Sequence, residues 1–277
     1  MFAFLLNFFQ KKGIELVAPI RLRDCKIQKP YLLERAEIES GTVFMLAVPY
    51  FTTACLSPCR NISAYAVSRD YHMFFEETFG ELLPMLKERY PNGRFACFAD
   101  HSPIAEADAA ARAGLGVIGK NGLLITEKYS SYIFLGEIIT SYEEKSIPAP
   151  KQKQECESCG KCQKACPMTV SGGICLSALT QKKGSLTEEE IATLCRYGSV
   201  WGCDICQEVC PHTQKAKESG SILSPVPFFS EKNVAHLTSS ILNGMTSTEF
   251  SQRAYAWRGR DTVERNLRLI EKNTEKC

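Results

Sequence analysis

The feature that most constrains this chain is a pair of cysteine runs in its second half, which together hold seven of its fourteen cysteines. The first run spaces its cysteines by x2, x2 and x3, the second by x2 and x3, and both end in Cys-Pro. This is the pattern of bacterial proteins with two [4Fe–4S] clusters, in which the last cysteine of each run binds the cluster of the other run. The runs consist of Cys156, Cys159, Cys162 and Cys166, and of Cys203, Cys206 and Cys210.

Two such clusters need eight thiolates, one more than the runs supply. A complete second run would carry a cysteine at position 200, where the sequence has Val200. Cys175 and Cys195 lie between the runs and are the candidates for the eighth ligand, and spacing alone does not separate them. The other cysteines have no ligand spacing, and we expect them to behave as small buried hydrophobic residues. They are Cys25, Cys55, Cys59, Cys97 and Cys277.

Disulfides and zinc are the other common uses of closely spaced cysteines. Disulfide frameworks suit short secreted chains, whereas a chain of 277 residues, 44% of them hydrophobic, can bury a core without covalent staples. Structural zinc sites use paired C-x2-C motifs. Three cysteines at x2 spacing followed by Cys-Pro do not fit that arrangement, so we predict iron–sulfur clusters.

The ends and the overall charge give weaker signals. Residues 1–12 are rich in phenylalanine and leucine, but they lack a basic leader region and are too short to span a bilayer. We therefore expect a buried first helix, no membrane partner, and a cytoplasmic location in which thiols stay reduced. The net charge of +2 gives no general case for a nucleic-acid partner. The arginine-rich stretch after residue 250 is either a solvated helix face or a phosphate-contacting surface.

Hydrophobic periodicity divides the chain into three parts. In residues 1–145, strands alternate with helices, which predicts an α/β layer structure. The expected strands are 43–50, 94–99, 123–126 and 132–140, and the expected helices are 62–90 and 104–113. A polar, proline-bearing linker follows at 146–154, and Thr187 with Glu190 predicts a helix start within the cluster region. Beyond residue 215 the chain is loop-rich to about residue 245 and then ends in a helix.

Two segments of the first part are candidates for chemistry. Asp100 follows the strand 94–99 and precedes His101 and Pro103. That position suits general acid–base catalysis, although an Asx turn or a helix cap is the alternative role. The glycine-rich segment 114–122 fits no phosphate-binding register, because a strand rather than a helix follows it. We expect its backbone to approach a bulky cofactor.

Taken in order along the chain, several short motifs resemble those of the epoxyqueuosine reductases. They are Tyr65-Ala66 with Arg69-Asp70-Tyr71-His72, Asp100-x-x-Pro103, the segment 112–121, Phe134-Leu-Gly-Glu137-Ile, and the two cysteine runs with Trp201. The match extends from about residue 43 to residue 213, and weakly onward through 257–260 and 265–266. The series is specific as a set, whereas each motif alone is not.

The resemblance implies a fold, cofactors and a reaction. The fold is α/β (α+β), with a nitroreductase-like cobalamin-binding module at 1–145, a ferredoxin-like domain with two [4Fe–4S] clusters at 146–215, and a loop and helical extension at 216–277. The implied enzyme is an oxidoreductase that accepts electrons from a donor such as a flavodoxin or ferredoxin. It reduces the epoxide of epoxyqueuosine in tRNA to give queuosine.

The resemblance also implies roles for single residues. The proton-donating aspartate of the family falls on Asp100, and the family cysteine between the two runs falls on Cys175. One cluster would be bound by Cys156, Cys159, Cys162 and Cys210, and the other by Cys166, Cys175, Cys203 and Cys206. The implied cobalamin contacts are Arg69, Gly119, Lys120, Asn121 and Glu137.

The chain departs from the family pattern at three places. It has Asp100-His101-Ser102-Pro103 where the family usually has Asp-Thr-Gly-Pro, the interval from Cys166 to Cys175 is short, and we expect a short form without the helical-repeat domain of longer members. Two other functions therefore stay open. One is the reduction of another epoxide or electrophile, as in reductive dehalogenases, with Tyr129 or Tyr132 as the proton donor. The other is electron transfer without a corrin.

Overall fold

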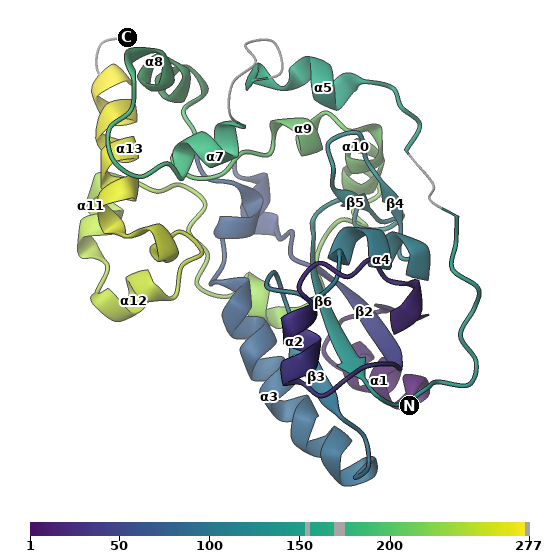
Figure 1. The fold of residues 1–277 in the computed structure, drawn as a ribbon. Helices are drawn as coiled ribbons and strands as arrows, with labels where there is room; N and C mark the ends of the chain where they lie inside the picture. Colours follow the sequence, from purple (N-terminus) through teal and green to yellow (C-terminus); the bar gives the residue numbers. More distant parts are fainter. Residues whose placement is uncertain (153–155, 169–174, 275–277) are drawn as a thin grey trace. The chain divides into compact units, whose positions relative to one another are not determined.

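The computed structural model describes residues 1–152, 156–168 and 175–274, which form two compact units (Figure 1). Unit 1 consists of Met1–Tyr50, His72–Cys159 and Lys215–Pro227, and unit 2 of Phe51–Tyr71, Gly160–Gln214 and Phe228–Cys277. Each unit thus combines segments that are far apart in the sequence. The expected module boundaries at 145 and 215 stay predictions. Cys277 and part of the expected linker 146–154 lie outside the described residues.

Unit 1 is built on a four-stranded sheet with the order β1-β2-β6-β3, in which all neighbouring strands are antiparallel. Its strands are β1 (Leu16–Arg21), β2 (Thr42–Pro49), β3 (Phe95–Phe98) and β6 (Ile133–Thr140). A separate small hairpin joins β4 (Val117–Ile118) to β5 (Leu124–Ile125). The antiparallel pairing makes this an α+β arrangement, within the fold class expected from the sequence.

Helices cover both faces of the sheet, which is why all eight residues of β2 are buried. On one face lies α4 (Glu106–Ala113), whose buried alanines pack among residues of β1, β2 and β6. On the other face, α3 (Tyr71–Arg89) places the ring of Phe75 against Gly136 of β6, where a Cβ atom would lie 2.4 Å from the ring. Because successive strand residues point to opposite faces, Glu137 faces the α4 side.

Two further helices complete unit 1. The first, α1 (Phe2–Gln10), buries Leu5, Phe8 and Phe9, so the prediction of a buried first helix is confirmed. Phe2 also stacks on Phe44 of β2, with 6.2 Å between the ring centroids. The short helix α2 (Pro30–Arg35) begins at a proline, a residue that suits the first helical turn.

Unit 2 is mainly helical. Its helices are α5 (Lys161–Ala165), α7 (Leu176–Thr180), α8 (Glu188–Tyr197), α9 (Ile205–Glu208), α11 (Ser239–Gly244), α12 (Ser247–Ser251) and α13 (Arg260–Thr274), and α10 (Pro211–Glu218) begins in it. The helices α5 and α9, which carry Cys162 and Cys206, pack against each other, and α13 packs on α7, α8 and α11. The predicted helix start is confirmed, since Thr187 and Glu190 form a capping box at the start of α8.

One predicted helix is shorter than expected. The helical periodicity over 62–90 holds only from Tyr71 onward, and the preceding residues form a single 3-10 turn at Ala64–Ala66. The reason is tertiary pairing within unit 2: Ile62 forms a parallel bridge with Trp201, and Arg69 an antiparallel bridge with Arg253. The elements that were not predicted are the strands β1 and β4 and the helices α2, α5, α7, α9, α10, α11 and α12.

In the arginine-rich stretch after residue 250, three side chains donate hydrogen bonds to backbone carbonyl groups of unit 2. Arg253 donates to the carbonyl of Lys232 at 2.7 Å, and Arg260 donates to that of Leu242 at 2.6 Å. Arg265 donates to the carbonyl of Lys182 at 2.7 Å. The expectation of a simple solvated face is therefore wrong for these three side chains. Among the described residues, no helix is long and apolar enough to cross a bilayer.

Candidate active site and cluster region

Asp100 lies in the loop between β3 and α4 of unit 1, and its backbone φ is 66°. This left-handed conformation is uncommon for a residue other than glycine. The side chain is 65% exposed, and its Oδ2 lies 3.5 Å from Nε2 of His72. The Asp100 N–H donates a hydrogen bond to Oε1 of Glu106 at 3.3 Å. The loop thus holds the aspartate in a constrained backbone position and presents its carboxyl group to solvent.

Two buried or partly buried carboxyl groups lie behind this loop. Glu137 is completely buried, and neither of its carboxyl oxygens meets the geometry of a hydrogen bond. Burial raises its pKa well above the usual range, and the negative charge of Glu106 adds to the shift, while the Ser102 hydroxyl opposes it. Burial likewise raises the pKa of Glu106 to about 7, and the charge of Asp100 contributes. This pair can therefore hold a proton near neutral pH.

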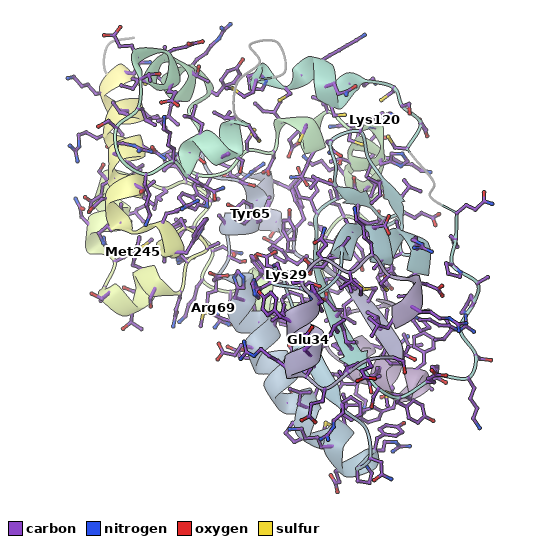
Figure 2. The ribbon with its side chains drawn as sticks, in the orientation of Figure 1. Lys29, Glu34, Tyr65, Arg69, Lys120 and Met245 are labelled. Atoms are coloured by element: carbon purple, nitrogen blue, oxygen red, sulfur yellow. The ribbon has the colours of Figure 1, made fainter. Side chains whose placement is uncertain are left out.

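The rest of the loop is held by residues just before α2 and in its first turn. The carbonyl of Pro103 accepts from the N–H groups of Gln28 and Lys29, at 2.8 and 3.1 Å. The His101 ring lies between Lys29 Nζ, 3.2 Å from Nδ1, and the Tyr31 hydroxyl, 3.0 Å from Nε2 (Lys29 is labelled in Figure 2). Because a lysine ammonium group can only donate, Nδ1 is the acceptor in this arrangement. His101 therefore links the Asp100 loop to its neighbouring segment.

The glycine-rich segment forms the turn of the β4–β5 hairpin, so the expected strand after it is confirmed. The Gly119 N–H donates to the carbonyl of Leu123 at 2.8 Å, and a Cβ atom at Gly119 would lie 2.4 Å from Oδ1 of Asn121. Lys120 is exposed at the turn (Figure 2). At Gly122, a Cβ atom would enter open space. The turn thus presents Lys120, Gly122 and the exposed side chain of Leu123 to its surroundings.

The other residues considered in the sequence have contacts of their own. Arg69 belongs to unit 2, where its guanidinium lies 4.0 Å from the ring centroid of Phe228 and forms an ion pair with Glu231 at 3.2 Å. The remaining expected corrin contacts belong to unit 1. Tyr129 is fully buried, and its hydroxyl donates to Glu15 at 2.8 Å. That hydroxyl is thus occupied as a donor within unit 1. Tyr132 is also fully buried.

The cysteines of unit 2 divide into groups by their surroundings. Burial raises the pKa of the Cys203 thiol to about 12, and the charges of Asp204, Cys206 and Cys175 add to the shift, so the Cys203 sulfur lies within electrostatic range of both other cysteines. Cys175 is exposed immediately before α7, and Cys210 is buried. Cys195 instead donates to the carbonyl of Leu269 in α13 at 3.4 Å.

The remaining predicted ligands lie on either side of the division between the units. Cys156 and Cys159 belong to unit 1, and the N–H of Cys156 donates to the carbonyl of Ile118 at 3.2 Å. Cys162 lies on α5, and Cys166 follows it directly. Among the residues that the structure describes, no three His, Cys, Asp or Glu side chains are already gathered as a metal site. The two ligand sets stay predictions.

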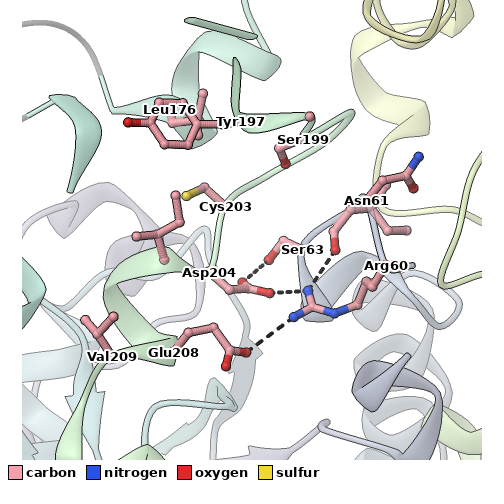
Figure 3. Close-up of a pocket in the computed structure, with 13 residues that line it drawn as sticks. Arg60, Asn61, Ser63, Leu176, Tyr197, Ser199, Cys203, Asp204, Glu208 and Val209 are labelled. Carbon is pink, nitrogen blue, oxygen red and sulfur yellow. Dashed lines mark hydrogen bonds and ion pairs between the residues drawn. The ribbon is translucent and has the colours of Figure 1, made fainter. Parts of the chain in front are cut away.

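A cavity of about 350 Å³ lies beside Cys203 in unit 2 (Figure 3). Arg60 and Asp204 line it and form an ion pair, with 2.5 Å between Nη1 and Oδ2. Neither residue was singled out in the sequence, and neither was Glu106. The sequence could have pointed to Asp204, because it lies within the second cysteine run. It could also have pointed to Glu106, because it lies close to Asp100. Nothing in the sequence pointed to Arg60, because its partner is 144 residues away.

The chain resembles known proteins in both sequence and fold. No family model matches it. It is 35% identical over 210 residues to the epoxyqueuosine reductase of Listeria monocytogenes, an alignment that covers 73% of this chain and 54% of the relative. It is 33% identical over 199 residues to that of Gloeobacter violaceus, with 69% and 61% covered. The chain therefore spans a little over half the length of these curated relatives.

Solved structures show the same fold. The epoxyqueuosine reductase of Streptococcus thermophilus superposes with a TM-score of 0.73 at 22% identity, covering 99% of this chain and 81% of that one. An epoxyqueuosine reductase with an epoxyqueuosine-modified tRNA-Tyr stem loop gives a TM-score of 0.75 at 23% identity, covering 98% and 81%. The structure from Bacillus subtilis, described with its catalytic aspartate loop swung out of the active site, gives 0.72 at 22% identity, covering 98% and 82%.

Proposed function

Because this chain belongs to the epoxyqueuosine reductase family, we propose that it reduces the epoxide of epoxyqueuosine in tRNA to give queuosine. The observation that carries the proposal is the 30–35% identity to curated epoxyqueuosine reductases over about 70% of the chain. The solved complex with a modified tRNA stem loop supports tRNA as the substrate. The proposed location of the enzyme is the cytoplasm, where tRNA and reduced thiols are found.

Two [4Fe–4S] clusters deliver the electrons in this proposal. Cys156, Cys159, Cys162 and Cys210 bind one cluster, and Cys166, Cys175, Cys203 and Cys206 bind the other. The packing of α5 on α9 supports this arrangement, because it pairs the helices that carry one cysteine from each run. The electrostatic contact of Cys175 with Cys203, and the engagement of Cys195 with Leu269, favour Cys175 as the eighth ligand. A flavodoxin or ferredoxin is the proposed donor of these electrons.

Cobalamin is the proposed cofactor at which the electrons are used, and it supplies nucleophilic attack by reduced cobalt on an epoxide carbon. Gly119, Lys120 and Asn121 are proposed to hold it, together with Arg69. The hairpin turn fits a bulky flat ligand, since it exposes backbone and leaves open space at Gly122. Glu137 is completely covered by protein, which fits a position behind the Asp100 loop better than direct contact with a cofactor.

Asp100 is the proposed proton donor to the epoxide oxygen as the carbon–oxygen bond breaks. Its exposed carboxyl group can reach a substrate, and the hydrogen bond from its N–H to Glu106 fixes the loop. Glu106 and Glu137 can hold a proton near neutral pH, because the pKa of each is raised. The negative charge that these two carboxyl groups place behind a protonated Asp100 is therefore small. The occupied Tyr129 hydroxyl makes a tyrosine donor less suitable.

One assay tests the proposal directly. Protein reconstituted without oxygen with iron, sulfide and cobalamin is incubated with a strong reductant and tRNA that carries epoxyqueuosine, and queuosine is measured by mass. We expect conversion that requires both cofactors. Protein that contains both cofactors but leaves epoxyqueuosine unchanged would contradict the proposal.

A further inference from the structure

A buried ion pair connects the second cysteine run to a segment about 140 residues earlier. Arg60 and Asp204 lie in unit 2, with side chains only 14% and 4% exposed. The Asp204 carboxylate also accepts hydrogen bonds from the Ser63 hydroxyl (Figure 3) and, at 2.7 Å, from the Ala64 N–H. Its charge is therefore held by three separate donors of one segment.

The Asp204 side chain does not cap the backbone of the helix that it precedes. Asp204 immediately precedes α9, a position at which an aspartate usually accepts from the backbone of the helix that it starts. Its side chain makes no such bond. The backbone carbonyl of Asp204 accepts from the N–H groups of Gln207 and Glu208 at 2.9 and 2.8 Å, and its carboxylate accepts from the side-chain amide of Gln207 at 3.2 Å. The carboxylate thus caps no backbone N–H of α9, and it forms its ion pair with Arg60.

Arg60 is fixed just as firmly. Its Nε donates to the carbonyl of Cys55 at 2.9 Å, its Nη1 to the carbonyl of Ile62 at 2.8 Å, and its Nη2 lies 3.3 Å from Glu208. Burial of two charges costs several kcal/mol for each ion, and a well-packed apolar pair is often equally stable. Stability alone therefore does not account for an ion pair at this place. Its position between two cysteines of one run points to an electrostatic role.

We propose that Arg60 and Asp204 act as positioning residues that fix the loop of Cys203 and Cys206 and set the reduction potential of the cluster bound there. The inference rests on the proposed cluster ligation. Cluster potentials depend on nearby charge and on solvent exposure. A bare carboxylate next to the ligands would oppose the addition of an electron and lower the potential. Arg60 balances that charge, and the low polarity around the buried pair strengthens the effect.

The test compares charge-changing variants in reconstituted full-length protein. Asp204→Asn keeps the shape of the side chain and removes its charge, and Arg60→Met removes the opposite charge. EPR-monitored redox titration measures the reduction potentials of the two clusters. We expect one of them to become more positive in Asp204→Asn and more negative in Arg60→Met. The double variant should return toward the wild-type value. The control Glu189→Gln, at an exposed position on α8, should leave both potentials unchanged.

Iron and sulfide analysis separates the possible failures. Wild-type protein that binds no clusters contradicts the proposed function itself. Clusters at full content with the same potentials in all variants overturn the inference and leave the proposed function intact. If a single variant loses its clusters, the double variant decides: restored clusters support charge compensation, and continued loss shows that the pair serves only packing.

Discussion

The backbone N–H of Asp100 donates to Oε1 of Glu106 at 3.3 Å, so the loop that presents the exposed aspartate is tied to a carboxyl group whose pKa is raised to about 7. The charge of Glu106 in turn helps to raise the pKa of Glu137, which lies fully buried on β6. The three acids thus form a series from solvent to the core of unit 1. Protonation at the buried end stabilises the loop, because fewer negative charges then face one another.

Replacement of Asp100 by asparagine should abolish turnover without loss of cofactors. Asparagine tolerates the left-handed backbone at this position, so the loop should keep its conformation. A missing general acid slows such a reaction by about 100-fold or more. Queuosine formation measures the loss, and iron and corrin contents should equal those of wild-type protein. Turnover within a few-fold of wild type would remove Asp100 from the mechanism, and Asp261→Asn, exposed at the start of α13, is the matched control.

The free energy of unfolding should depend on pH through Glu106. In the unfolded chain its pKa is 4.5, and in the folded protein it is about 7. The folded state therefore binds more protons between these values, and stability falls as the pH rises from about 4.5 to about 7. Glu106→Gln should reduce this fall by on the order of 1 kcal/mol. Urea titrations at about pH 5 and about pH 7.5 measure the difference.

The control for this experiment is Glu34→Gln, which changes an exposed acid on α2 (labelled in Figure 2). It should leave the pH dependence as it is in wild-type protein. If the free energy of unfolding of Glu106→Gln falls with pH as much as that of wild-type protein, the pKa of Glu106 is not raised.

Cys175 and Cys195 should differ in their effect on iron content. Cys175→Ala removes a proposed ligand and should lower the iron bound after reconstitution by about half, which is one cluster of two. Cys195→Ala removes only the thiol that donates to Leu269, so its iron content should stay at the wild-type level. Iron and sulfide analysis measures both. Equal iron in the two variants, or loss in Cys195→Ala alone, would contradict the ligand assignment.

Two glycines should respond in opposite directions to a methyl group. Gly136→Ala places a Cβ atom 2.4 Å from the Phe75 ring and should lower the free energy of unfolding by about 1–3 kcal/mol. Gly80 lies within α3 with nothing near its position for a Cβ atom, so Gly80→Ala should raise stability by about 0.5–1 kcal/mol. Chemical denaturation measures both changes. A neutral Gly136→Ala would mean that α3 can move away from the sheet.

Local structure could be predicted where it depends on residues close together in the sequence, and the cluster chemistry stays a prediction. Cysteine spacing predicts the cluster type, the Thr187–Glu190 pair predicts the start of α8, and periodicity predicts most strands and helices of unit 1. The 3-10 turn at Ala64–Ala66 could not be predicted from the helical pattern around it. Backbone pairing of Ile62 with Trp201 overrides that pattern.

By itself, the sequence predicts the ligand chemistry and most elements of unit 1, and it carries the similarity to the epoxyqueuosine reductases. Only the tertiary structure decided that Glu106 and Glu137 act on each other, and that Arg60 reaches Asp204 across 144 residues. Both relationships depend on burial and on long-range contact. Desolvation shifts a carboxyl pKa, or makes an ion pair strong, only where distant segments fold together and exclude water.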